Sequence, residues 1–166
     1  MKVNIALLTV TDTRTLKSDK SGGILANKIK KANHNLVDRK ICKDNKKDIK
    51  KILKAWTKKK KVDVIITTGG TGLTGRDITP EALNEIADKH IPGFGEIFRT
   101  ISLETVGTSS IQSRACAILS KGKYIFALPG SSGGVTDAWD KILVHQLDIN
   151  HKPCNFVELF PRLKEK

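Results

Sequence analysis

The chain has 166 residues, of which 39% are hydrophobic, and this length and composition suit a single domain (residues 1–166) with a sizeable core. Its formal net charge is +13. Its three cysteines lie far apart and form no C-x-x-C pair, which argues against a disulfide framework and a cysteine zinc site. Because we find no signal peptide and no apolar stretch of about 20 residues, we expect a cytoplasmic protein without a membrane span.

The positive charge is concentrated in lysines between Lys28 and Lys61. These lysines fall on what read as solvated helix faces, no aromatic residues interleave with them, and no nucleic-acid-binding module is recognisable. We therefore interpret the charge as a solvated surface and expect no nucleic-acid partner. The alternative is a basic RNA-binding domain, for which affinity would fall steeply as salt is raised.

Strand-like and helix-like patterns alternate along the chain. In order, they predict a strand over residues 3–10, a helix over 19–32, a strand over 36–42, an amphipathic helix over 49–56, a buried strand over 62–68 and a helix from 79 to about 87. The pattern is then helical or irregular over residues 91–119, with a strand over 123–128, a turn over 129–134, a helix over 135–142 and an irregular carboxyl end. Such alternation implies right-handed crossovers and a mostly parallel sheet with helices on both faces.

Two local expectations follow from residue type. Thr79 and Pro80 suit the start of a helix, with a capping hydroxyl and a proline at the first helical position. Trp56 and Trp139 lie on the apolar stripes of predicted helices, so we expect both indole rings in the core. The four histidines share no spacing or partner motif, and we assign none of them to catalysis or metal binding.

Polar residues follow the predicted strands. In an open parallel sheet, ligands bind in the crevice outside the carboxyl ends of the strands. The loops at that edge carry Thr11, Asp12, Thr13 and Arg14, then Lys43, Asp44 and Asn45, then residues 69–77, and finally Pro129, Gly130, Ser131 and Ser132. If the strands are parallel, these groups face one crevice.

The most informative loop is the glycine-rich stretch that follows the strand over residues 62–68. Glycines at this density let the backbone approach a ligand and direct several N–H groups at one anion, and threonine hydroxyls add donors. The candidate phosphate-binding residues are Thr68, Gly69, Gly70, Thr71, Gly72, Thr74 and Gly75. A plain turn is the alternative, but such a turn typically needs only about 2 to 6 residues.

Two common phosphate motifs fit this loop poorly. Gly70, Gly72 and Gly75 satisfy G-x-G-x-x-G, but the next helix begins only at Thr79 and no second strand ending in an acid follows. A P-loop requires Gly-Lys-Ser or Gly-Lys-Thr, which is missing here. The loop is therefore a phosphate-binding candidate of another type.

Asp77 indicates a divalent cation. A carboxylate beside bound phosphates repels them unless a cation bridges the two, and Mg²⁺ typically accepts one or two carboxylates plus phosphate oxygens. Asp44, after another strand, is the candidate second ligand. Helix capping is the alternative for Asp77, and a plain turn aspartate is the alternative for Asp44.

Several motifs in the chain closely resemble those of the MoaB/MogA family of molybdenum cofactor biosynthesis proteins. They are TTGGTGLTGRDITPEA (67–82), IPGFGE (91–96), IQSRA (111–115), ALPGS (127–131), AWD (138–140) and KPCNF (152–156). The resemblance covers almost the whole chain, favours the MoaB branch and implies a three-layer α/β/α sandwich that assembles as a trimer or hexamer. It departs from the Leu-Pro-Gly-x-Pro pattern of the MogA branch at residues 128–132.

The resemblance also implies an activity, the Mg²⁺-assisted transfer of AMP from ATP to the terminal phosphate of molybdopterin. Asp44 and Asp77 match the two acids that active relatives use, so the resemblance makes them the catalytic, metal-binding pair. Asp12 and Arg14 are expected at the crevice rim, Pro129, Gly130 and Ser131 beside the ligand, and Ser113 and Arg114 near a phosphate or pterin, unless the last two only occupy a helix surface. The alternative function is a protein that binds the pterin or nucleotide without turnover.

Overall fold

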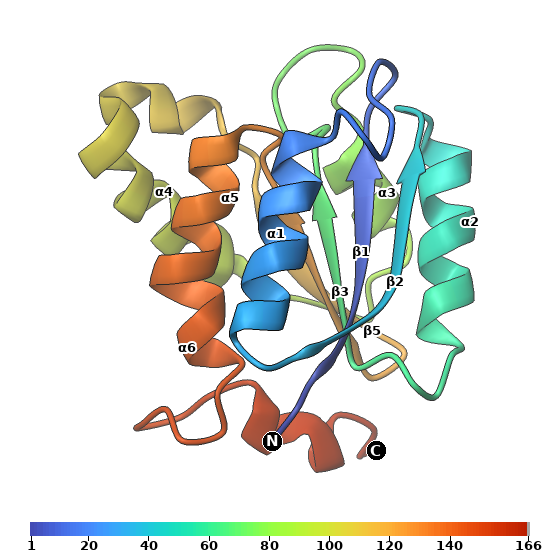
Figure 1. Cartoon of the computed structure of the whole chain (residues 1–166), viewed down its shortest axis with the longest axis vertical. Helices are drawn as coiled ribbons and strands as arrows, with labels where there is room; N and C mark the ends of the chain where they lie inside the picture. The colour runs from blue at the N-terminus through green and yellow to red at the C-terminus, as the bar shows by residue number, and fades with distance from the viewer. Residues whose placement is uncertain (166) are drawn as a thin grey trace.

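The computed structural model describes residues 1–165, which form one six-stranded sheet between two layers of helices (Figure 1). The strands are β1 (Asn4–Val10), β2 (Asn35–Cys42), β3 (Val64–Thr68), β4 (Lys89–His90), β5 (Cys116–Ser120) and β6 (Lys123–Leu128). The α-helices are α1 (Lys20–Lys31), α2 (Lys46–Thr57), α3 (Thr79–Asn84), α4 (Pro92–Val106), α5 (Ser132–Ala138) and α6 (Val144–Gln146). A π-helical turn, η2 (Trp139–Leu143), joins α5 to α6, and the 3₁₀ helices are η1 (Gly107–Gln112) and η3 (Val157–Arg162).

The sheet has the order β2-β1-β3-β6-β5-β4 and is mostly parallel, as predicted. The pairs β2–β1, β1–β3 and β3–β6 are parallel, whereas β5 pairs antiparallel with β6 and with β4. The expectation that residues 91–119 are only helical or irregular was wrong, because β5 begins at Cys116, inside that stretch. Lys121 and Gly122 connect β5 to β6 with φ of 52° and 71°, the backbone of a tight two-residue hairpin turn.

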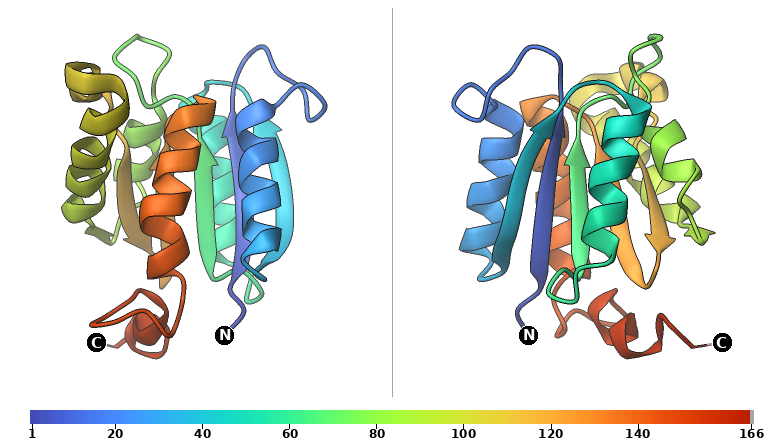
Figure 2. Two further views of the ribbon diagram at one scale, coloured as in Figure 1. Left: turned by 60° about the vertical axis from the view of Figure 1, so that its left-hand side comes forward. Right: turned by 90° about the vertical axis from the view of Figure 1, so that its right-hand side faces the viewer.

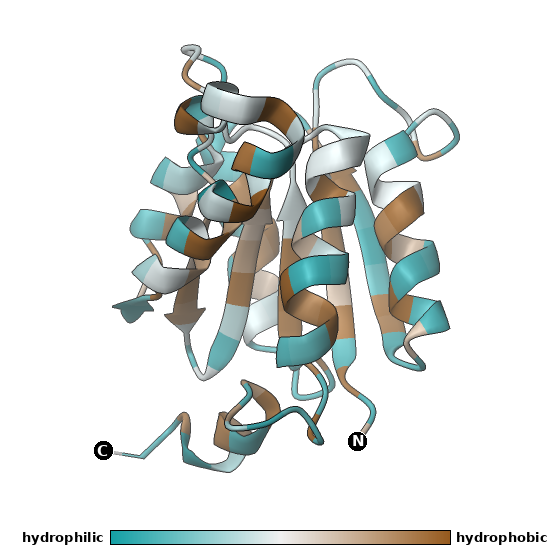
Figure 3. Ribbon diagram, turned by 90° about the vertical axis from the view of Figure 1, so that its left-hand side faces the viewer, coloured by the Kyte–Doolittle hydropathy of each residue, from teal (hydrophilic) through white to brown (hydrophobic). Residues whose placement is uncertain are grey.

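Two hydrophobic cores fill the space between the sheet and its helices. Ile5 and Leu7 of β1 belong to one core, and Ala6 and Leu8 belong to the other, because successive side chains of a strand point to opposite faces. Helices α1, α4 and α5 lie over the first face, and α2 and α3 lie over the second (Figure 2). Hydrophobic residues accordingly concentrate on the strands and on the sides of the helices that face them (Figure 3).

The two tryptophans lie in opposite cores, as expected. Trp56 of α2 is 0% exposed, and Trp139 of the turn after α5 is 2% exposed. Each indole therefore stabilises one helix layer on the sheet rather than offering a surface for stacking a ligand.

Some helix starts differ from the predicted ones. Helix α5 begins at Ser132, inside the predicted turn, because the Ser131 hydroxyl accepts a 3.1 Å hydrogen bond from the amide of Gly134 and caps it. Thr79 does begin α3, but its hydroxyl caps nothing and instead donates to the carbonyl of Gly69 at 2.9 Å. The capping role predicted for Thr79 was therefore wrong.

The carboxyl-terminal segment passes beneath the sheet, at the end opposite the ligand crevice predicted from the loops (Figure 1). Its Phe156 packs on Tyr124 of β6 with ring centroids 4.7 Å apart. The prediction of an irregular carboxyl end missed η3, which follows Phe156 directly. Within residues 1–165, every helix is too short or too polar to cross a membrane.

Candidate functional site

The loops after four strands gather at one edge of the sheet. Strands β1, β2, β3 and β6 run in the same direction, so their carboxyl ends meet at the upper edge in Figure 1. The structure thus brings the loop after β1, the Asp44 turn, the glycine loop (residues 69–77) and the start of α5 to one end of the molecule. This is the arrangement in which α/β sheets bind ligands.

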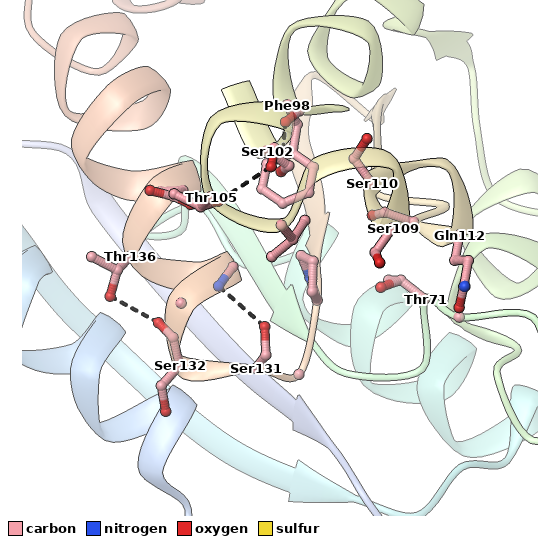
Figure 4. A pocket seen from close by; sticks show the side chains of 18 of the residues that line it. Thr71, Phe98, Ser102, Thr105, Ser109, Ser110, Gln112, Ser131, Ser132 and Thr136 are labelled. Carbon is pink, nitrogen blue, oxygen red and sulfur yellow. Dashed lines mark hydrogen bonds between the residues drawn. The ribbon is translucent and has the colours of Figure 1, made fainter. Parts of the chain in front are cut away.

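Two adjacent hollows open at this edge. The larger has a volume of about 960 Å³ and lies between the glycine loop, the α4–η1 segment and the start of α5 (Figure 4). The smaller, of about 310 Å³, lies between the loop after β1, Asp44 and the glycine loop. Gly70 and Gly130 line both hollows, so a narrow glycine ridge separates them.

The larger cavity combines an apolar wall with many hydroxyls. Phe98 and Val106 supply apolar surface. The polar lining includes Ser102, Thr105, Ser109, Ser110, Gln112 and Thr136. Such a cavity suits a ligand with a flat ring system and several polar edges, because a few placed polar groups orient a ligand within a mostly apolar pocket.

Sequence reasoning did not find the α4–η1 wall. Ser102, Thr105 and Ser109 are spaced like residues on one side of a helix, and this row of hydroxyl side chains is the sequence feature that could have indicated the cavity wall. The row alone does not say whether it faces solvent or a cavity. Packing of α4 on β5 and beside α5 decides the matter, and neither contact can be read from periodicity.

The backbone of the glycine loop is fixed by close contacts. Gly69 and Gly70 have φ of +103° and +67°, which side-chain-bearing residues rarely adopt. A Cβ on Gly69 would lie 2.2 Å from the Val10 carbonyl oxygen. The Thr68 hydroxyl lines the smaller hollow but donates to the Pro129 carbonyl at 2.7 Å. Glycine is therefore required at the first two positions of the loop.

Asp44 and Asp77 approach the loop at nearby positions. A Cβ on Gly70 would lie 3.3 Å from Asp44 Oδ1, and one on Gly72 would lie 2.8 Å from Asp77 Oδ2. Asp44 lines the smaller hollow and Asp77 the larger one, so the two carboxylates do not share a single cavity. They flank neighbouring stretches of the same backbone.

The two carboxyls differ in acidity. Partial burial, and then the negative charge of Asp77, raise the pKa of Asp44. Partial burial also acts to raise the pKa of Asp77, but hydrogen bonds from the Thr74 hydroxyl and amide, at 2.6 and 2.9 Å, hold it below its ordinary value. A cation near both carboxylates would relieve the repulsion that raises the pKa of Asp44.

These acids fit a magnesium ion that is shared with a phosphate ligand. Mg²⁺ takes oxygen ligands, and one or two carboxylates suffice when phosphates supply the others. Among residues 1–165, no group of three or more His, Cys, Asp or Glu side chains comes together to hold a metal alone. Asp44 and Asp77 are the residues that would supply carboxylate oxygens to such an ion.

Other predicted residues lie at the rim or at the loop tip. Arg14 lines the smaller hollow. Asp12 lines neither hollow; it pairs with Arg76 and accepts a 3.2 Å hydrogen bond from the amide of Asp44. Thr74 and Gly75 also lie outside both hollows, and Thr74 contributes by holding the Asp77 carboxylate.

The remaining predicted residues divide between the cavity and the back of the loop. Thr71, Gly72, Ser113, Pro129, Gly130 and Ser131 line the larger cavity, as a binding role requires. Arg114 does not line it. The Arg114 guanidinium donates instead to the carbonyl oxygens of Gly72 and Asp77, at 2.7 and 2.5 Å. Arg114 thus lies in neither of the two expected places, beside a phosphate or pterin or on a helix surface, but on the backbone of the glycine loop.

Comparisons with known proteins agree with this geometry. The family model described as a probable molybdopterin binding domain matches residues 6–149. Molybdenum cofactor biosynthesis protein B of Escherichia coli K12 is 44% identical over 161 residues, which cover 97% of this chain and 93% of the relative. The protein of the same name from Bacillus cereus is 44% identical over 147 residues, which cover 88% of this chain and 87% of the relative.

Solved structures extend the similarity to the whole fold. A crystal structure of a molybdenum cofactor biosynthesis protein B superimposes with a TM-score of 0.90 at 39% identity and covers 100% of this chain and 98% of that chain. The tungsten cofactor synthesizing protein MoaB from Pyrococcus furiosus superimposes with a TM-score of 0.75 at 34% identity, covering 86% and 91% of the two chains. The three-layer α/β/α sandwich predicted from the sequence is confirmed, and the chain belongs to the MoaB/MogA family of probable molybdopterin-binding domains.

Proposed function

We propose that this protein acts in molybdenum cofactor biosynthesis and transfers AMP from ATP to the terminal phosphate of molybdopterin. Membership of the family supports the pathway and the pterin ligand. One observation carries the proposed reaction: Asp44 and Asp77 flank the backbone of Gly70 and Gly72 beside two adjacent hollows. The two hollows would each hold one ligand. The two carboxylates would then lie near the place where the phosphates of the two ligands meet.

The larger cavity is the proposed site for the pterin. Its volume of about 960 Å³ lies within the range of small-molecule sites, which is roughly 300–1,000 Å³. Phe98 and Val106 would pack on the ring system, and hydroxyls along α4 and η1 would bind its polar edges. The smaller hollow, with Arg14 and the hydroxyls of Thr11, Thr13 and Ser21, is the proposed site for nucleotide phosphates.

The reaction needs no protein nucleophile. An oxygen of the pterin phosphate forms a bond to the α-phosphorus of ATP, and the bond from that phosphorus to pyrophosphate breaks. The chain's contribution is to hold the two phosphates in line and to exclude other orientations, which can lower a barrier substantially. Backbone N–H groups of the glycine loop and the hydroxyl of Thr71 are the proposed phosphate donors.

Asp44 and Asp77 are the proposed catalytic residues, and their carboxylates are the proposed metal ligands. They would hold Mg²⁺ together with phosphate oxygens, and the ion would neutralise charge on the transferring and leaving phosphates. The Thr74 hydrogen bonds orient the Asp77 carboxylate before any ligand arrives. Asp12, bonded to the amide of Asp44, fixes the backbone of the second acid.

A second candidate function is binding without turnover. Asp77 already accepts two hydrogen bonds from Thr74, and it faces a different hollow from Asp44. A protein that only holds molybdopterin or a nucleotide would need no shared metal. This observation supports storage or delivery as the alternative to catalysis, and a turnover assay decides between the two.

The deciding experiment mixes the purified protein with molybdopterin, ATP and Mg²⁺ and measures pyrophosphate and adenylated pterin. Adenylyl transfer predicts both products in equal amounts. The Asp77→Asn variant should lose turnover while binding molybdopterin nearly as well as the unmutated chain, because the change removes charge and keeps shape. Binding without any product in the unmutated protein would establish the second candidate.

We also propose a homo-trimer or homo-hexamer in the cytoplasm, with residues 1–166 acting as one domain and with no nucleic-acid or membrane partner. The support for assembly is that Ile97, Leu103 and Ile111, three large apolar side chains on α4 and η1, are exposed. These side chains are between 52 and 81% exposed, which is costly unless another surface covers them.

A further inference from the structure

Arg114 lies behind the glycine loop, in the segment between η1 and β5. Its Nε donates a 2.7 Å hydrogen bond to the carbonyl oxygen of Gly72. Its Nη2 donates to the carbonyl oxygen of Asp77 at 2.5 Å, and its Nη1 binds the carboxylate of Glu81. Its own backbone N–H donates to the carbonyl of Thr71 at 2.9 Å. One arginine therefore joins both ends of the 72–77 loop to the first turn of α3.

These contacts determine where the Asp77 side chain lies. The guanidinium binds the main-chain carbonyl of Asp77, whereas the carboxylate of the same residue lines the larger cavity. Because Arg114 binds both Gly72 and Asp77, it holds together the two ends of the loop tip between them. The hydrogen bonds from the Thr74 amide and hydroxyl then hold the Asp77 carboxylate in one orientation.

We propose that Arg114 is a positioning residue, which holds the backbone of Gly72 and Asp77 so that the Asp77 carboxylate faces the bound phosphates. Arg114 itself touches neither ligand. The inference rests on the proposed function in one respect only, the role of Asp77 at the phosphates. The clamp on the loop is independent of that role.

The geometry requires arginine rather than any cation. The planar guanidinium presents N–H groups in fixed directions, and here they reach two carbonyl oxygens and one carboxylate. A lysine ammonium is a single point of charge on a flexible stem, and it cannot span Gly72 and Asp77 together. A phosphate contact by Arg114 would require these bonds to break and the loop to open.

The test uses the full-length protein with Arg114→Lys, Arg114→Gln and Glu81→Gln. The matched control is Arg162→Gln, which removes an arginine that pairs with Glu165 away from the loop. The first measurement is hydrogen exchange of the amides of residues 72–77. We expect faster exchange there in both Arg114 variants, a smaller increase in Glu81→Gln, and no change in the control.

The second measurement is the Mg²⁺ concentration that gives half-maximal pyrophosphate release. Removing a group that orients a metal ligand typically costs about 10–100-fold in metal affinity. We therefore expect this concentration to rise at least about tenfold in Arg114→Lys, with most of the rate recovered at saturating Mg²⁺. A purely structural loss would lower the amount of active protein and leave the Mg²⁺ requirement unchanged.

An unchanged Mg²⁺ requirement in Arg114→Lys would overturn the proposal, and so would either of two further results. One is wild-type exchange of residues 72–77 in the Arg114 variants. The other is a loss of molybdopterin binding in Arg114→Lys with an unchanged loop, which would make Arg114 a direct ligand. If the unmutated protein releases no pyrophosphate, the proposed function fails, and hydrogen exchange alone still decides whether Arg114 clamps the loop.

Discussion

The hydroxyl of Thr79 donates a 2.9 Å hydrogen bond to the carbonyl of Gly69, and the amide of Thr79 donates to the carbonyl of Gly70 at 3.0 Å. These two bonds join the first residue of α3 to the first two residues of the glycine loop. Thr79 is completely buried, so neither bond competes with water. The loop is consequently a closed structure, anchored at its base before any phosphate binds.

Thr79→Val should destabilise the protein and loosen the loop. The change keeps the shape of the side chain but leaves the buried Gly69 carbonyl without its donor, which typically costs about 1–3 kcal/mol. Urea unfolding measures the loss. The control is Thr100→Val, whose hydroxyl bonds to the Glu96 carbonyl on an exposed part of α4 and whose loss should cost less than about 0.5 kcal/mol. Equal effects of the two changes would contradict the anchoring role of Thr79.

Gly70→Ala should damage the site more than an ordinary glycine substitution. Gly70 has a φ of +67°, and an added Cβ would lie 2.5 Å from the Thr79 hydroxyl and 3.3 Å from Asp44 Oδ1. The left-handed backbone alone costs roughly 1–2 kcal/mol, and the contact with Thr79 adds to it. We expect a lower unfolding midpoint together with weakened molybdopterin binding.

The matched control for Gly70→Ala is Gly23→Ala. Gly23 lies in α1, and an added Cβ there meets no atom within 4 Å. Alanine in a helix interior is typically more stable than glycine by roughly 0.5–1 kcal/mol, so this variant should be as stable as the unmutated protein or more stable. A Gly70→Ala protein with unchanged stability and unchanged molybdopterin binding would show that the glycine loop tolerates a side chain at position 70, between the two hollows.

The central strands β1, β3 and β6 could be predicted because they are buried on both faces. Such strands appear as continuous apolar runs, and β6 occupies the predicted residues 123–128. The strand direction that follows from this pattern places Asp44 and Asp77 at one edge of the sheet. Both acids lie beside the glycine loop because the alternation of strands and helices makes these strands parallel, and parallel strands end at the same edge of the sheet.

The antiparallel half and the details of the loop could not be predicted in the same way. Strand β5 is five residues long and follows a polar stretch, so only the Lys121-Gly122 turn signalled a hairpin. The family resemblance led us to expect Arg114 near a phosphate or pterin, with a helix surface as the alternative. In the folded chain, the carbonyl oxygens of Gly72 and Asp77 and the carboxylate of Glu81 already accept its hydrogen bonds, which no sequence pattern indicates.

Ile111→Asp should reduce the size of the assembly. Ile111 of η1 is 81% exposed, so a charge there would disrupt a subunit contact that buries it. Sedimentation velocity should show a trimer or hexamer for the unmutated protein and smaller species for the variant. Leu16→Asp, an equally apolar but separate exposed position, is the control and should leave the assembly intact. A monomeric unmutated protein would rule out the proposed assembly.

Asp19→Asn should destabilise the protein at neutral pH. The side chain of Asp19 is 0% exposed and accepts hydrogen bonds from Thr9 Oγ1, the Gly22 amide and Arg39 Nη2, at 2.6, 2.9 and 3.0 Å. Asparagine keeps the shape but removes the charge that Arg39 neutralises. Because Arg39 is partly exposed, we expect a loss of about 2–3 kcal/mol rather than the larger cost of a fully buried pair.

The loss caused by Asp19→Asn should shrink as the pH falls. Burial acts to raise the pKa of Asp19, but the hydrogen bonds from Thr9, Gly22 and Arg39 outweigh it and hold the pKa below its ordinary value. A depressed pKa means that the carboxylate stabilises the fold above about pH 4, the ordinary value for aspartate, and that this contribution disappears as the pH falls through the lower folded value. Urea unfolding of both proteins from neutral pH to about pH 3 measures the difference. Asp140→Asn, which removes an exposed pair with Lys28, should change stability by less than about 1 kcal/mol across the same range. A difference for Asp19→Asn that stays constant with pH would show that the charge of Asp19 contributes nothing to the fold.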